Sequence, residues 1–385
     1  MTVDGFPAEF QWGVASSSVG TEGAASTADW YAWERSRGLP PSGDGNGWAT
    51  NYADDAGLLA SLGVRALRVT VDWARLEPTA GRVDGQRVEH ERRVLETVRD
   101  AGLQPWITLH HTALPGWFAE DEGGFRDERA RNYFWPRHVD RCAEWFEDLA
   151  AGWVPIEDPV GWAHRAFFAG SRPPGRTSAE VAHDALIGVF EANDAAWRIL
   201  RGGNAPVMCV LELPSVRSRP PADPDAAAWH RAPWDTPVRA LHEGILTAPG
   251  GAELERPEME GTFDMVGVAY VHYPRGDGSA FDASAEAAEL SEAIRRLAEQ
   301  LPDKPMVVAA HGLGTADDKK REALLRATVD ELRLVLRDGI DLRGYFHDTG
   351  IDGYDFATGF ARPRGLVTRA REIKDSGHWL QELLT

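Results

Sequence analysis

Carboxylates and histidines follow several short apolar runs of this sequence, where an α/β protein usually carries its chemistry. These residues are Glu157, Asp158, Glu212 and Asp348, with His110, His111, His272, His311 and His347. Such groups transfer protons as general acids and bases, and converging histidines and carboxylates can also bind zinc, manganese or iron. Because adjacent carboxylates repel each other, we expect a raised pKa for one member of the pair Glu157 and Asp158.

Two features of the histidines favour a structural role for some of them. His110 and His111 are neighbours, and neighbouring residues of a regular strand face opposite ways, so both cannot point into one site. The sequence also contains no HExxH and no His-x-His spacing. We therefore expect some histidines to be hydrogen-bonded core residues, and we expect no bound metal and no cofactor.

The elements that must position these residues repeat one pattern, an amphipathic helix followed by a short apolar strand. Gly102 can cap a helix at Val88–Asp100, for example, and a strand at Pro105–His111 follows. The alternation gives eight candidate strands, near Trp12, Val69, Ile107, Val154, Val210, Val266, Val308 and Phe346. Apolar strands alternating with helices predict an α/β fold, a single (β/α)8 TIM barrel over residues 1–385. The chemistry of such a barrel lies at the C-terminal ends of its strands.

Other stretches predict surface features. Segments rich in Pro, Gly and Asp predict loops at Arg37–Gly47, Arg217–Trp234 and Pro274–Ser284. The basic run Lys319-Lys320-Arg321 opens a helix, and we interpret it as a solvated face rather than a binding patch.

The charge of the chain limits its expected partners. Acidic residues number 60 and basic residues 41, which gives a net charge of −19. Such a surface repels phosphate backbones and anionic lipids, so we expect neither nucleic acid nor a membrane as a partner. Two cysteines without a CxxC spacing, no visible signal peptide and no apolar run long enough to span a membrane favour a cytoplasmic protein.

Motifs along essentially the whole chain resemble those of family 1 β-glycosidases, which are TIM barrels. They include Phe10-x-Trp12-Gly13-Val14-Ala15-Ser16-Ser17, Trp73-x-Arg75-Leu76-x-Pro78, Thr108-Leu109-His110-His111, Glu157-Asp158-Pro159, Asp341-x-Arg343-Gly344-Tyr345-Phe346 and Arg364-Gly365-Leu366. The resemblance implies descent from retaining glycosidases, in which two carboxyl groups about 5–5.5 Å apart act as nucleophile and as acid/base.

The catalytic positions depart from the family pattern. Ala310 stands where the resemblance places the nucleophilic glutamate, and Asp158 stands where it places the acid/base. Glu157 replaces the Asn that contacts the sugar 2-hydroxyl, and Asp348 replaces the Trp beneath the sugar. The resemblance therefore implies that the family mechanism cannot operate as it stands, and Asp158, Glu157 and Asp348 are the candidate acid/base groups.

Several sugar-recognition positions also differ from the family pattern. Gly20 stands in place of the family's Gln, and Thr112 stands in place of its Trp. The candidate substrate-binding residues are His111, Arg68, Tyr270, Asp355, Phe356, His110 and His311. Among these, Arg68 matches the arginine that neighbours the nucleophile in the family.

Several functions are compatible with this pattern. The leading expectation is a barrel that has lost the retaining mechanism and binds or transforms a small polar, sugar-like molecule. The alternatives are a residual β-glycoside hydrolase with Asp158 as acid, a non-glycosidic and possibly metal-dependent enzyme built on the strand-end histidines and carboxylates, and a non-catalytic sugar-binding protein. The sequence does not choose among them, so it leaves open whether the chain is an enzyme.

Overall fold

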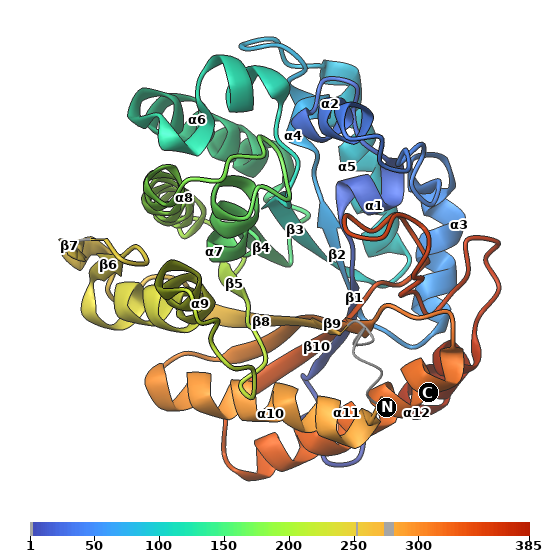
Figure 1. Ribbon diagram of the computed structural model, residues 1–385. Helices are drawn as coiled ribbons and strands as arrows, with labels where there is room; N and C mark the ends of the chain where they lie inside the picture. Colours follow the sequence, from blue (N-terminus) through green and yellow to red (C-terminus); the bar gives the residue numbers. More distant parts are fainter. Residues whose placement is uncertain (1–2, 252, 273–280) are drawn as a thin grey trace.

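The computed structural model describes residues 3–251, 253–272 and 281–385. Within them, eight strands pair in parallel in the order β4-β3-β2-β1-β10-β9-β8-β5. They are β1 (Gln11–Ala15), β2 (Ala66–Thr70), β3 (Gln104–His110), β4 (Gly152–Ile156), β5 (Met208–Glu212), β8 (Met265–His272), β9 (Met306–Leu313) and β10 (Leu342–Asp348). Every strand expected from the sequence is found, and the TIM-barrel prediction is confirmed (Figure 1).

The barrel closes between β4 and β5, the two ends of that strand order. Trp153 forms a parallel bridge with Val207, and Glu157 forms another with Val210. The backbone N–H of Asp158 donates to the Val210 carbonyl at 3.0 Å. The backbone of the candidate acid/base pair is therefore part of the barrel wall.

Helices surround the strands (Figure 1). The α-helices are α1 (Ser18–Glu22), α2 (Asp29–Ser36), α3 (Trp48–Ser61), α4 (Trp73–Leu76), α5 (Gly85–Asp100), α6 (Glu128–Phe146), α7 (Pro159–Ala163), α8 (Ala179–Leu200), α9 (Pro224–Glu243), α10 (Ala283–Gln300), α11 (Asp318–Arg337) and α12 (Asp375–Leu384). Short helices of other pitch are η1 (Trp117–Asp121), η2 (Gly124–Arg126), η3 (His164–Phe168) and η4 (Pro257–Met259), and β6 (Ile245–Thr247) pairs with β7 (Glu253–Glu255) as an antiparallel hairpin. In the part of the chain that the structure describes, no helix is long and apolar enough to cross a membrane.

The alternation of side chains along each strand builds two apolar layers. Val69, Ile107 and Val266 belong to the large layer between the strands and the helices. Trp106 and Phe346 belong to a smaller cluster whose residues fill the barrel interior, with their ring centroids 6.0 Å apart. The interior is thus packed with side chains, and polar groups can gather only near the strand ends.

A β-bulge interrupts β9 where the candidate site begins. Val308 pairs with Val268 and Ala310 pairs with Ala269, so β9 carries one extra residue, Ala309, between these pairs. Ala309 and Ala310 both belong to the interior cluster. Because a bulge redirects the side chains beside it, this one turns Ala310 into the barrel.

The structure corrects one of the three predicted loops. Residues 37–47 lie between helices as expected, but α9 begins at Pro224 and runs through most of the predicted loop Arg217–Trp234. The Asp223 side chain accepts from the Ala226 N–H, and proline is favoured at the first helical position, so these residues mark a helix start. Of the stretch Pro274–Ser284, residues 274–280 lie outside the described residues, and α10 begins at Ala283.

The interpretation of the basic run as a solvated face is correct for two of its residues and wrong for the third. Lys319 and Lys320 are exposed at the start of α11, whereas Arg321 is buried. Arg321 pairs with Asp318 and donates to the carbonyls of Thr315 and Pro363. It therefore ties the loop after β9 to the closing segment of the chain.

We expect Arg321→Ala to lower the free energy of unfolding by about 3 kcal/mol, because it removes one partner of a buried ion pair and leaves two carbonyls without their donor. The matched variant Lys320→Ala should change it by less than about 0.5 kcal/mol. Urea unfolding followed by tryptophan fluorescence measures both. Equal effects of the two variants would contradict the structural role of Arg321.

Candidate functional site

A buried ion pair joins the ends of β2 and β4 inside the barrel. The side chains of Arg68 and Glu157 are 1% and 7% exposed. Arg68 Nη1 donates to Glu157 Oε2, and Nη2 donates to Oε1 at 3.1 Å, so the contact is bidentate. Nη1 also donates to the Thr108 hydroxyl on β3 at 3.2 Å. Three neighbouring strands thus share one polar contact at the bottom of the site.

His111 joins this pair from the loop after β3. Its Nδ1 lies 3.0 Å from Glu157 Oε2, and its side chain is 24% exposed. Thr112, the next residue, has a φ of 78°, which is rare for a β-branched residue and marks a sharp change of chain direction after His111. Burial by itself would raise the pKa of Glu157, but Arg68 and His111 outweigh it and hold that pKa well below its usual range. Glu157 is therefore an ionised acceptor at neutral pH.

A second ion pair lies at the end of β10. Arg364 Nη1 is 2.8 Å from Asp348 Oδ2, and its Nη2 is 3.3 Å from Asp355 Oδ2. Asp355 also accepts from the backbone N–H groups of Ala357 and Thr358, so it fixes a tight turn. Burial raises the pKa of Asp348, the charge of Arg364 lowers it, and the nearby charge of Glu157 raises it again. The two ion pairs are thus electrostatic neighbours.

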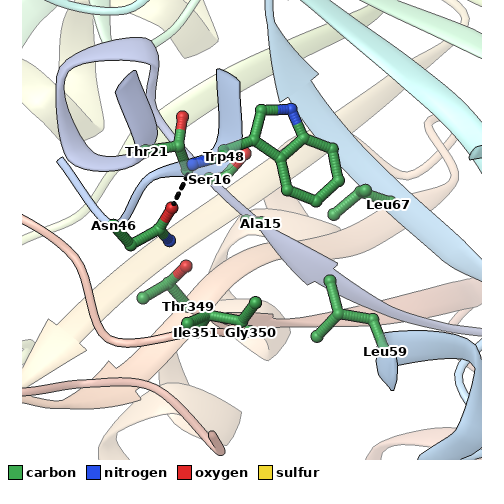
Figure 2. Close-up of a pocket in the computed structure, with 10 residues that line it drawn as sticks. All are labelled: Ala15, Ser16, Thr21, Asn46, Trp48, Leu59, Leu67, Thr349, Gly350 and Ile351. Carbon is green, nitrogen blue, oxygen red and sulfur yellow. Dashed lines mark hydrogen bonds between the residues drawn. The ribbon is translucent and has the colours of Figure 1, made fainter. Parts of the chain in front are cut away.

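The space beside β1 and Asp348 is small. A cavity here has a volume of about 20 Å³. Figure 2 shows the residues that line it: Ala15, Ser16, Thr21, Asn46, Trp48, Leu59, Leu67, Thr349, Gly350 and Ile351. In it the Asn46 side chain accepts from the Trp48 N–H at 3.1 Å. A neighbouring cavity of about 10 Å³ includes Gly20, Asp348 and Arg364 in its lining. Cavities of this size hold a single water molecule and not a sugar.

The chain itself fills the position of the family's Gln. A Cβ on Gly20 would lie 2.8 Å from Ser17 Oγ and 3.0 Å from the Tyr354 carbonyl oxygen. The Tyr354 N–H donates to the Gly20 carbonyl at 3.1 Å. The segment after β10 is therefore packed directly onto α1, and a side chain at residue 20 requires Ser17 or Tyr354 to shift.

Asp158 points away from Glu157. It has a left-handed backbone (φ 49°), and its side chain accepts from the Gly161 N–H at 3.1 Å as the cap of α7. Arg165 donates to Asp158 Oδ2 at 2.7 Å, and its other nitrogen is 3.2 Å from Glu212. Burial and the charge of Glu212 raise the pKa of Asp158, and the charge of Arg165 opposes them. The net result is a pKa of about 6. The expectation of a raised pKa is correct, but the repelling neighbour is Glu212.

Tyr270, His311 and His110 lie apart from Glu157 in the layer outside the barrel. The Tyr270 hydroxyl donates to Glu289 of α10 at 2.8 Å. His311 Nδ1 is 3.0 Å from the Tyr345 hydroxyl, and its ring centroid is 5.2 Å from that of His272. His110 packs edge-on against the rings of Phe125 and Trp162. These side chains do not join the mouth of the barrel.

Burial also decides the protonation of these histidines. Burial lowers the pKa of His110 and of His347 to about 3, and that of His311 well below its usual range. His311 and His347, which are neutral and hydrogen-bonded in the core, match the structural role expected for some of the histidines. The described residues contain no group of three or more His, Cys, Asp or Glu side chains arranged to hold a metal ion.

Comparisons with known proteins agree with this architecture. The model of "Glycosyl hydrolase family 1" matches residues 2–233 and 258–385. The chain belongs to glycosyl hydrolase family 1. It is 23% identical over 445 residues to "Beta-glucosidase A" of Thermotoga maritima, with 100% of this chain and 98% of the relative covered.

Solved structures of family 1 proteins share the fold. A β-glucosidase of Thermotoga maritima in complex with glucoimidazole has a TM-score of 0.84 at 20% identity, with 98% of each chain covered. A β-glycosidase from Pyrococcus horikoshii has a TM-score of 0.85 at 22% identity, with 100% of this chain and 95% of the other covered. At these identities the likeness concerns the fold alone.

Sequence reasoning did not include Arg364, Arg165 or Thr108 among the site residues of this family 1 barrel. Arg364 was visible only as part of a closing motif. Arg165 follows Asp158 by seven residues, and nothing in that spacing shows that the two side chains meet. A buried carboxylate requires a cation or a hydrogen-bond donor, so a partner was to be expected for each acidic candidate. The sequence does not show which residue that partner is.

We expect Glu157→Gln to lower the free energy of unfolding by about 3–5 kcal/mol, because Arg68 would remain charged and buried without its partner. Asp148→Asn, which breaks the exposed pair with Arg92, should cost less than about 1 kcal/mol. Urea unfolding at neutral pH measures both. A loss below 1 kcal/mol for Glu157→Gln would contradict the pairing.

The difference in unfolding free energy between the native chain and Glu157→Gln should depend on pH. Because the folded-state pKa of Glu157 is lowered, its stabilising effect is complete above the ordinary carboxyl value of 4.5 and is lost as the pH falls through the folded value. The stability gap between the native chain and Glu157→Gln should therefore narrow below about pH 4.5. A gap that widens on acidification would contradict the lowered pKa.

Proposed function

We propose that this family 1 barrel does not cleave β-glycosides by the retaining mechanism and instead binds a small polar, sugar-like molecule at the C-terminal mouth of the barrel. One observation carries the proposal: Glu157, the carboxylate inside the mouth, is bound to Arg68, while the nucleophile position is the methyl group of Ala310. We further propose one barrel domain acting in the cytoplasm, in keeping with the two buried free cysteines, without a nucleic-acid partner.

The geometry supports the loss of hydrolysis. A retaining enzyme needs a nucleophile and a proton donor on either side of one bond. Glu157 is ionised and cannot donate a proton at neutral pH. Asp158 can hold a proton, but it caps α7 and is bound by Arg165. The two adjacent carboxyls therefore cannot act on one glycosidic bond as a pair.

The polar groups nearest to solvent support binding. The side chains of His111, Asp348 and Arg364 are 24%, 13% and 15% exposed, so a small molecule that lies outside the two small cavities can contact them. They offer an imidazole, a carboxylate and a guanidinium, which can donate to and accept from hydroxyl groups. Solved relatives are complexes with glucoimidazole and with deoxynojirimycin, which supports a sugar-like ligand here.

A residual hydrolase with Asp158 as acid is the second candidate, and the pKa of about 6 favours it. A metal-dependent enzyme has less support, because His110 and His311 lie outside the barrel among aromatic residues.

We expect no turnover of activated aryl β-glucosides or β-galactosides by the native chain or by Asp158→Asn. Ala310→Glu should also remain inactive, because Glu157 already binds Arg68 and Asp158 points away. Release of nitrophenol at a fixed enzyme concentration measures all three. Turnover that Asp158→Asn abolishes would overturn the proposal in favour of the residual hydrolase.

Binding should appear as a rise in melting temperature. We expect a monosaccharide or imino sugar at about 100 times its Kd to add about 2.7 kcal/mol to the stability of the native chain. His111→Ala should remove this shift, whereas His378→Ala on the distant helix α12 should keep it. Absence of a shift across a panel of sugars and imino sugars, or a shift that both variants keep, would reject the mouth as the binding site.

A further inference from the structure

A second cleft lies on the flank of the barrel, between α7, the end of β5 and α9. Its volume is about 340 Å³, within the range of small-molecule sites. Asp158, Arg165 and Glu212 line one end of it, and Trp229 of α9 lines the other side. Neither Arg68 nor Glu157 is among the described residues that line it, so the cleft is separate from that buried ion pair, although Asp158 follows Glu157 in the chain.

The charged end of this cleft carries an excess of negative charge. Arg165 is shared between Asp158 at 2.7 Å and Glu212 at 3.2 Å, which leaves two carboxyl groups for one guanidinium. The Glu212 side chain is 49% exposed, so its carboxylate faces solvent. Burial, with a smaller contribution from Arg165, lowers the pKa of His164, so this lining residue adds no positive charge at neutral pH. A cation is the complementary ligand, and the net charge of −19 adds to the attraction.

Apart from His164 and His230, the rest of the cleft lining is apolar. Leu213, Pro214, Pro221 and Pro233 form its wall. Trp229 is buried, and its ring stacks on Phe168 at 5.4 Å. Its indole N–H is buried without a hydrogen-bond partner among the described residues.

We propose that this cleft binds a small organic cation, an ammonium group attached to an apolar or aromatic body. The ammonium group pairs with the accessible carboxylate of Glu212, opposite the side already taken by Arg165. The apolar body lies against Leu213 and the prolines and replaces water there. The proposal does not depend on what the mouth of the barrel binds.

Titration calorimetry of the full chain with phenethylamine tests the proposal, with 2-phenylethanol as the neutral probe of the same body. We expect saturable one-to-one binding of the amine, and binding of the alcohol that is at least about tenfold weaker. Glu212→Gln should weaken amine binding by about tenfold or more. Glu253→Gln, an exposed glutamate paired with Arg239 far from the cleft, should leave it unchanged.

Quenching of tryptophan fluorescence by the amine, lost in Trp229→Phe, would place the ligand in this cleft. Three results would overturn the proposal: no saturable binding of the amine, equal affinity for the amine and the alcohol, or amine binding that Glu212→Gln leaves unchanged. Because Glu212 is exposed, its variant should remain folded, and unfolding in urea checks this directly.

Discussion

A guanidinium buried inside a barrel must have an anion, and this requirement organises the site. Arg68 is almost fully buried at the end of β2 and would be costly without a partner. In the family pattern the arginine neighbours the nucleophilic glutamate, and here that position is Ala310. Glu157 on the neighbouring wall supplies the charge instead.

The two adjacent carboxylates, Glu157 and Asp158, bind different arginines and point in different directions. The side chain of Glu157 turns into the barrel toward Arg68 and His111, whereas the left-handed backbone of Asp158 directs its carboxyl toward α7 and Arg165. Their pKa values move in opposite directions for this reason, downward for Glu157 and upward for Asp158. Divergent pKa values often mark an acid and a base, but these two groups face different spaces.

The remaining polar residues of the strands differ in how deeply they are buried. The histidines of β9 and β10, His311 and His347, are hydrogen-bonded in the layer outside the barrel, where burial keeps them neutral. Asp348 and Asp355, by contrast, share Arg364 near the mouth. Near the mouth, the carboxylates of Glu157, Asp348 and Asp355 are therefore each held in an ion pair with an arginine.

The sequence by itself determined the barrel, because the alternation of apolar strands and amphipathic helices is local and repeats eight times. It also predicted which residues stand at the family's catalytic positions, Ala310 and Asp158, since a motif is read residue by residue. It missed the start of α9, where Asp223 and Pro224 are signals of a helix cap as well as of a loop. Only the tertiary structure decided which side chains meet. It pairs Arg68 with Glu157 and Arg165 with Asp158. It also places Tyr270 and His311 outside the barrel. The charged residues that pair are often far apart in the sequence. Their interaction energy depends on distance and burial in the folded chain, and neither can be read from local sequence spacing.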